Sequence, residues 1–116
     1  MSLNVDWDAA LASVNGDRGL LELVIGAFLT ESVELQDQIS TAIENDDAEL
    51  LHRCGHTFKG TMSSLGAANW SDMALRLEQL GATGTTAGAQ PIVDELNHHL
   101  SSLLEQLRTF SAEQSD

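Results

Sequence analysis

Hydrophobic residues recur at helical spacing along nearly the whole chain of 116 residues. Between residues 17 and 45 the apolar side chains lie three or four residues apart, which predicts one long amphipathic helix, either continuous or bent near residues 30–32. The same spacing at residues 47–66, about 69–80 and 91–107 predicts three further helices. The inward stripe of the first long helix is predicted to consist of Leu21, Val24, Phe28, Leu35, Ile39 and Ala42.

Residues typical of helix ends separate these segments. Asp6 caps a short first helix that ends near Gly16, and Gly66 is placed to end the helix of residues 47–66 in the left-handed conformation. Pro91 fits the first turn of the last helix, where its missing N–H costs no hydrogen bond. Short links between four long helices indicate an all-α protein: an antiparallel four-helix bundle with the short N-terminal helix as a cap.

The composition agrees with this architecture and limits the function. Hydrophobic residues make up 42% of the chain and aromatic residues only 4%, a balance that favours packed helices over a sheet. We expect one domain at residues 5–110, with flexible termini at residues 1–4 and 111–116. The formal charge of −13 argues against nucleic acid or an anionic membrane surface as a partner. A lone cysteine, Cys54, and the lack of a signal peptide or a membrane-spanning apolar run indicate a cytoplasmic protein.

The negative charge is distributed unevenly along the chain. Residues 1–50 carry eleven acidic side chains and one basic one, and residues 81–116 carry five and one, but residues 51–80 carry only two and three. The middle segment is therefore the one part of the chain without a surplus of negative charge. It contains His52 and His56.

The helix of residues 47–66 has a hydrophobic face and an opposite polar face. At about 100° per residue, the polar face holds His52, His56, Lys59, Gly60 and Ser63. An exposed imidazole is nucleophilic near neutral pH and is able to accept a phosphoryl group, whose oxygen atoms Lys59 would help to neutralise. Glycine inside a helix costs on the order of 1 kcal/mol relative to alanine. We therefore interpret Gly60 as clearance beside His56 for another protein.

A second candidate surface lies on the helix of residues 17–45. Leu20, Leu23 and Ala27 fall to one side of the inward stripe of that helix. Two interpretations are open. These side chains either pack against the short N-terminal helix or form an exposed hydrophobic patch for a partner.

The segment from His56 to Ala67, HTFKGTMSSLGA, closely resembles the signature of histidine-containing phosphotransfer (HPt) domains. That signature is His, any residue, a hydrophobic residue, Lys, Gly, a small residue and then Leu-Gly-Ala. The resemblance covers the chain from about Val5 to Leu107. Gly55 and Phe58 stand where alanine and leucine are more usual, and both face inward, so these departures concern packing rather than chemistry.

The resemblance implies a phosphorelay intermediate. His56 would accept a phosphoryl group from a receiver-domain aspartyl phosphate and pass it to another receiver aspartate, with Lys59 beside the phosphate. A receiver would dock over the clearance at Gly60. We expect the rest of the contact surface to include His52, Ser63, Leu20, Leu23 and Ala27.

The resemblance also implies that the domain lacks a kinase activity and a cofactor of its own. It would have no autokinase activity, and the sequence contains no Gly-rich nucleotide-binding loop. It would need no cofactor of its own, because Mg²⁺ belongs to the receiver in this family. The expected partners of a monomeric domain are response-regulator receivers and, in cis, a hybrid histidine kinase.

Two alternatives remain open. Glu49-Leu50-Leu51-His52 and Glu95-Leu96-Asn97-His98 both have the Glu-x-x-His pattern found in di-iron carboxylate bundles. Such ligands must project into the bundle, yet helical spacing turns these side chains toward solvent, so we predict no metal site. In the other alternative, the chain is an adaptor bundle with the same fold, in which His56 is never phosphorylated.

Overall fold

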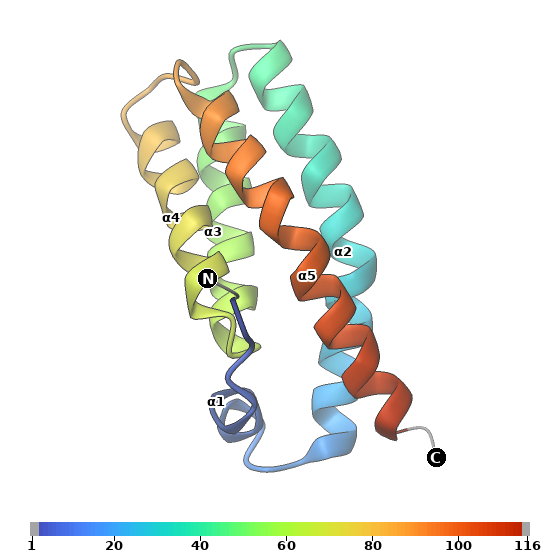
Figure 1. Cartoon of the computed structure of the whole chain (residues 1–116). Helices are drawn as coiled ribbons and strands as arrows, with labels where there is room; N and C mark the ends of the chain where they lie inside the picture. The colour runs from blue at the N-terminus through green and yellow to red at the C-terminus, as the bar shows by residue number, and fades with distance from the viewer. Residues whose placement is uncertain (1–2, 115–116) are drawn as a thin grey trace.

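The structure, a computed structural model, describes residues 3–114. These residues form helices and connecting turns and contain no strand, which confirms the all-α prediction. The long helices pack side by side, consecutive helices run in opposite directions, and the short helix lies at one end (Figure 1). The helices in chain order are α1 (Trp7–Ser13), α2 (Arg18–Glu44), α3 (Ala48–Ser64), α4 (Ala68–Ala82) and α5 (Ala89–Gln114).

The long helix α2 continues without a break through residues 30–32. Ser32 is buried there, but its hydroxyl donates a hydrogen bond to the Leu29 carbonyl (3.2 Å), which satisfies the polar group inside the helix. Besides Ser32, the inward stripe differs from the prediction at one turn of the helix. Ile25 is fully buried, whereas Val24 is only partly buried against the core.

The short helix α1 lies against the turn between α3 and α4, as the figure also shows (Figure 1). The Asp6 carboxylate caps α1, and the Asp6 main-chain N–H donates to the Gly66 carbonyl (2.8 Å). Ser13 donates to the Ser64 carbonyl (2.8 Å) from the other end of α1. Gly66 has φ +73°, which confirms that it ends α3 in the left-handed conformation. Helix α1 therefore caps the α3–α4 end of the bundle.

Helices α3 and α4 form the closest pair in the bundle. A Cβ atom at Gly55 would lie 2.5 Å from the main-chain nitrogen of Glu78, and one at Gly81 would lie 2.5 Å from that of His52. The two backbones thus touch at two glycines, one contributed by each helix. This confirms the close-packing role expected of Gly55 and fixes which residues of α4 face which residues of α3.

The N-terminal segment of the described chain packs against α5. Gln106 accepts a hydrogen bond from the Val5 N–H (2.9 Å) and donates one to the Leu3 carbonyl (3.0 Å). Trp7 stacks on Phe110, with ring centroids 4.6 Å apart. Residue 3 is thus held against α5, and α5 continues to residue 114. The domain limits at residues 5 and 110 stay predictions, and residues 1–2 and 115–116 lie outside the described part.

The core is lined by Leu, Ile, Val, Ala and a few aromatic side chains from all five helices. Phe28 of α2 meets Phe58 of α3 edge-on, with ring centroids 6.1 Å apart. Cys54 is also buried in the core, and burial raises the pKa of its thiol. Within residues 3–114, no helix combines the length and hydropathy that crossing a membrane requires.

Candidate functional site

His56 projects from the outward face of α3, and its side chain is 66% exposed. Gly60 lies one turn further along the same face, and a Cβ atom placed on it would meet nothing within 4 Å. The space beside the imidazole is therefore open to an approaching molecule. Both positions agree with the helical spacing of the sequence.

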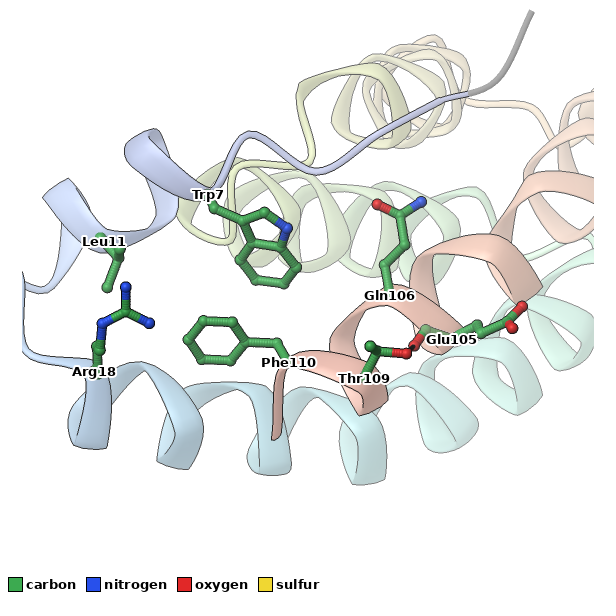
Figure 2. A pocket seen from close by; sticks show the side chains of 7 residues that line it. All are labelled: Trp7, Leu11, Arg18, Glu105, Gln106, Thr109 and Phe110. Atoms are coloured by element: carbon green, nitrogen blue, oxygen red, sulfur yellow. Dashed lines mark hydrogen bonds between the residues drawn. The ribbon is translucent and has the colours of Figure 1, made fainter. Parts of the chain in front are cut away.

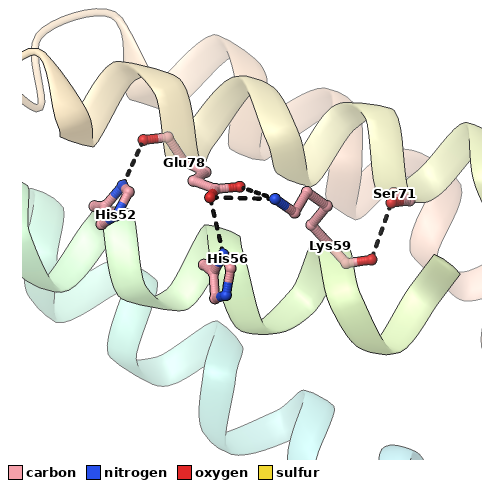
Figure 3. Close-up of polar contacts among 5 residues, drawn as sticks. All are labelled: His52, His56, Lys59, Ser71 and Glu78. Carbon is pink, nitrogen blue, oxygen red and sulfur yellow. Dashed lines mark hydrogen bonds and ion pairs between the residues drawn. The ribbon is translucent and has the colours of Figure 1, made fainter. Parts of the chain in front are cut away.

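The imidazole of His56 is held by a carboxylate on the neighbouring helix. Its Nδ1 atom lies 2.9 Å from Oε1 of Glu78 on α4 (Figure 3). An ionised carboxylate only accepts hydrogen bonds, so Nδ1 carries the proton and donates it to Glu78. The neutral ring then has its free lone pair on Nε2, which points away from Glu78 in Figure 3.

Lys59 is engaged by the same carboxylate. Its Nζ atom lies 2.8 Å from Oε2 of Glu78 and donates a hydrogen bond to Oε1 at 3.2 Å. Ser71 donates to the Lys59 main-chain carbonyl (2.9 Å) and ties this part of α3 to α4. The hydrogen bond from Lys59, and secondarily that from His56, lowers the pKa of Glu78 below its ordinary value of 4.5 against the opposing effect of burial. Glu78 therefore remains ionised at neutral pH.

His52 lies differently from our prediction. We expected an outward side chain in the docking surface, but the ring is only partly exposed and turns toward α4. Its Nδ1 donates to the main-chain carbonyl of Glu78 at 3.0 Å, as Figure 3 shows. The close α3–α4 contact brings this carbonyl within reach. His52 thus helps to hold α4 at Glu78, and its place in the docking surface stays a prediction.

Sequence reasoning missed Glu78 as a site residue. Helical spacing relates residues within one helix, whereas Glu78 reaches His56 from the next helix. A usable signal was present, because Glu78 is one of only two acidic residues in the segment 51–80. His56 and Glu78 also lie at similar distances before and after the turn at Gly66, where an antiparallel helix pair brings residues opposite each other.

The other predicted docking residues are exposed but do not touch His56. Ser63 lies two turns beyond His56 on α3. On α2, Leu20 and Leu23 are 44% and 72% exposed, and Ala27 is exposed as well. These exposures weigh against the interpretation that the three side chains pack against the N-terminal helix, although α1 does contact α2 as well as α3.

The α2 patch, which we define as Leu20, Leu23 and Ala27, can be placed relative to α3. Phe28 meets Phe58, and Gln38 accepts a hydrogen bond from Cys54 (3.5 Å). Helices α2 and α3 therefore run in opposite directions, and the first third of α2 lies level with the C-terminal end of α3. The patch is level with Ser63 rather than with His56.

One hollow on the structure lies away from His56. It has a volume of about 440 Å³ and lies between α1, the start of α2 and the end of α5, where Trp7, Leu11, Arg18 and Phe110 surround it (Figure 2). None of the predicted site residues lines it. His56 instead stands on an open helix surface, a location that suits contact with a macromolecule more than with a buried small ligand.

The residues of the di-metal alternative are dispersed. Glu95 pairs with Arg76, and His52 donates to the Glu78 carbonyl. His98 packs edge-on against His99. Among the residues that the structure describes, no group of three or more His, Cys, Asp or Glu side chains is arranged to hold a metal ion.

Comparison with known proteins identifies the family. The sequence profile of the Hpt domain matches residues 24–110. Histidine-containing phosphotransfer protein B (HptB) from Pseudomonas aeruginosa PAO1 superimposes with a TM-score of 0.83 at 20% identity, covering 96% of this chain and 95% of HptB. The HPT domain of an Hpt sensor hybrid histidine kinase from Shewanella gives a TM-score of 0.82 at 18% identity, covering 94% of each chain. No curated protein sequence matches this chain. The match to the profile over most of the length shows that the chain belongs to the Hpt domain family.

Proposed function

We propose that this domain is a phosphorelay intermediate in which His56 takes a phosphoryl group from a receiver aspartate and passes it to another. Membership of the Hpt family assigns the chain to histidine phosphotransfer in phosphorelays. The observation that carries the residue assignment is the 2.9 Å hydrogen bond between His56 Nδ1 and Glu78. This bond leaves Nε2 as the nucleophilic atom on an exposed ring.

In the transfer step, the Nε2 lone pair attacks the phosphorus of the aspartyl phosphate in line with the leaving oxygen. An N–P bond forms, the P–O bond to the aspartyl carboxyl group breaks, and its electron pair leaves with the carboxylate. The imidazole ring becomes positively charged because it keeps its Nδ1 proton. Transfer to the next receiver reverses these events.

Glu78 contributes to this chemistry through the ring. A carboxylate that accepts the Nδ1 proton selects the tautomer with a free Nε2 and stabilises the positive charge that develops on the imidazole, as the aspartate of a catalytic triad does. Lys59 keeps Glu78 ionised and oriented through its contacts at 2.8 and 3.2 Å. Glu78 is thus a positioning residue for His56.

The receiver would dock on the open face around His56. Gly60 leaves room for its backbone. We expect Ser63 and the α2 patch, which are exposed, to extend the docking surface toward the end of α3. An exposed apolar patch on a protein with a formal charge of −13 is unusual enough to favour a contact role. We expect Mg²⁺ only on the receiver, and we expect no autokinase activity.

The test mixes the domain with receivers that have been labelled by radioactive acetyl phosphate. Wild-type protein should gain acid-labile label from a cognate receiver, and His56→Gln should gain none. A glutamine removes the nucleophile and keeps a polar side chain at an exposed position, so the fold should persist. Label on His56→Gln at the wild-type level would mean that another residue is phosphorylated and would refute the assignment of His56. No label on the wild type from any cognate receiver would favour the adaptor alternative.

A further inference from the structure

Two cationic side chains flank His56 on α3. Arg53 lies three residues before it and Lys59 three residues after it. Residues three apart on a helix are surface neighbours, with Cβ atoms about 5–6 Å apart. At about 100° per residue, the two cations lie roughly 60° to either side of His56, Lys59 toward α4 and Arg53 away from it.

The charge of Lys59 is already neutralised. Its ammonium group contacts both carboxylate oxygen atoms of Glu78, and its side chain is only 31% exposed. The Lys59–Glu78 pair therefore carries no net charge. A phosphoryl group on Nε2 of His56 would find no uncommitted cation on this flank.

Arg53 differs from the other two cations of the α3–α4 pair. Lys59 is paired with Glu78 and Arg76 with Glu95, whereas no ion pair or hydrogen bond of the Arg53 side chain occurs within the described residues. Arg53 is exposed on the same outward arc as His56, and Glu49 one turn earlier does not pair with it. The guanidinium group is thus available beside the nucleophile.

We propose that Arg53 binds the oxygen atoms of the phosphoryl group on His56, while Lys59 acts indirectly by holding Glu78. This inference rests on the proposed function, which it refines by assigning the phosphate contact to a different residue. A guanidinium group binds two phosphate oxygen atoms at once through its fork of N–H donors. Its long side chain reaches the oxygen atoms of a phosphoryl group on the neighbouring turn.

Phosphoramidate provides a test without a receiver. Nε2 of His56 attacks its phosphorus, the P–N bond to the nitrogen breaks, and ammonia leaves, so only groups of this domain act on the phosphate. Phosphohistidine formation is followed by ³¹P NMR. Arg53→Ala should form the product about tenfold more slowly than the wild type, as expected for one lost charge-assisted hydrogen bond. Arg53→Lys should fall between the two, because it keeps the charge but loses the fork.

A second readout reports on the phosphoryl group itself. A neighbouring cation favours the dianion and lowers its pKa. The ³¹P shift of phosphorylated Arg53→Ala should therefore titrate at higher pH than that of the wild type. Arg108→Ala, which removes an exposed arginine from α5, is the matched control and should behave as the wild type in both measurements.

The outcomes separate the two proposals. Wild-type protein that gains no phosphoryl group from phosphoramidate or from any receiver contradicts the proposed function itself. If the wild type is phosphorylated and Arg53→Ala matches it in rate and in titration, the role of Arg53 is refuted. A defect of Arg53→Ala that appears only with a receiver as donor also refutes it, since Arg53 would then contact the partner protein and not the phosphate.

Discussion

Because Gly55 has no side chain, the backbone of α4 packs directly against α3 at Glu78, and this places the Glu78 carboxylate beside His56. A Cβ atom at Gly55 would lie 2.5 Å from the Glu78 nitrogen and 2.9 Å from its Cα atom. Because the backbones meet there, Glu78 is brought close enough to α3 to bond with His56, one residue further along. Close packing in the core thus determines the chemistry of an exposed residue.

Replacing Gly55 with alanine should disturb both the packing of α3 against α4 and the hydrogen bond between His56 and Glu78. The added methyl group meets main-chain atoms of α4, which cannot rotate away, so α4 must shift. We expect a loss of about 1–3 kcal/mol in the free energy of unfolding. Urea denaturation measures the stability, and ¹⁵N NMR of the imidazole should show that the Nδ1–H tautomer of His56 is no longer dominant.

Gly60→Ala is the matched control for this substitution. A Cβ atom at Gly60 would meet nothing within 4 Å, so alanine causes no clash there. Its only effect on stability is its higher helix propensity. It should stabilise the protein by about 0.5–1 kcal/mol. If Gly55→Ala were equally stabilising, the two helices would not be in the close contact described above.

The lowered pKa of Glu78 makes its contribution to stability dependent on pH. Its carboxylate is ionised at a lower pH in the folded than in the unfolded chain, chiefly because of the hydrogen bond from Lys59. The contribution is therefore complete above the ordinary pKa of 4.5 and disappears as the pH falls through the lowered value. Glu78→Gln should destabilise the protein at pH 7 by on the order of 1 kcal/mol. Once the pH has fallen below the lowered pKa of Glu78, the unfolding free energy of the variant should approach that of the wild type, and a difference that does not change with pH would contradict the assignment.

The Glu78 carboxylate should also affect the rate of phosphoryl transfer to His56. Glu78→Ala removes the acceptor for the His56 Nδ1 proton, so the neutral ring populates both tautomers and loses the stabilisation of its positive charge. The rate from a receiver should fall about tenfold to a hundredfold, the range found when a residue that orients a histidine is removed. Glu78→Gln keeps an acceptor and should lose less. Equal rates in wild type and Glu78→Ala in quench-flow experiments would remove Glu78 from the site.

The sequence predicts the site residues whose positions depend on one helix alone, but not those whose roles depend on contact between two helices. His56 and Gly60 lie on the same face because of helical spacing alone, and the structure agrees. Glu78 was missed and the turn of His52 toward α4 was not predicted, because both depend on the contact between α3 and α4. Residue spacing within one helix does not reveal how closely the neighbouring helix packs against it. Here the distance between the α3 and α4 backbones depends on Gly55 and Gly81.

The fold was more accessible to sequence reasoning than the surface was. Caps such as Asp6 and the left-handed Gly66 act locally, so the sequence alone indicates where helices begin and end. The continuity of α2 was undecided, because the spacing does not reveal that the buried Ser32 hydroxyl bonds within its own helix. The exposure of Leu23 was undecided for another reason. It depends on where α1 packs, which is a property of the whole bundle.

Gly60→Arg tests whether the open face is a docking surface. The arginine side chain would extend into free space next to His56, so the fold should be retained in circular dichroism. Transfer from a receiver should be blocked by steric overlap, whereas phosphorylation by the small donor phosphoramidate should continue. Undiminished transfer from a receiver would mean that the partner does not approach over Gly60.

Leu23→Glu tests the α2 patch, and Val33→Glu is its control. Both side chains are apolar and strongly exposed on α2, at 72% and 60%, but Val33 lies about ten residues away and on a different side of the helix. Neither change should alter the unfolding free energy by more than about 0.5 kcal/mol, since both positions are solvated. If receivers dock on the patch, Leu23→Glu should raise the receiver concentration needed for half-maximal transfer with little change in the maximal rate, the pattern of lost binding. Val33→Glu should leave both quantities unchanged, and equal effects of the two substitutions would indicate that added negative charge, rather than the patch, weakens docking.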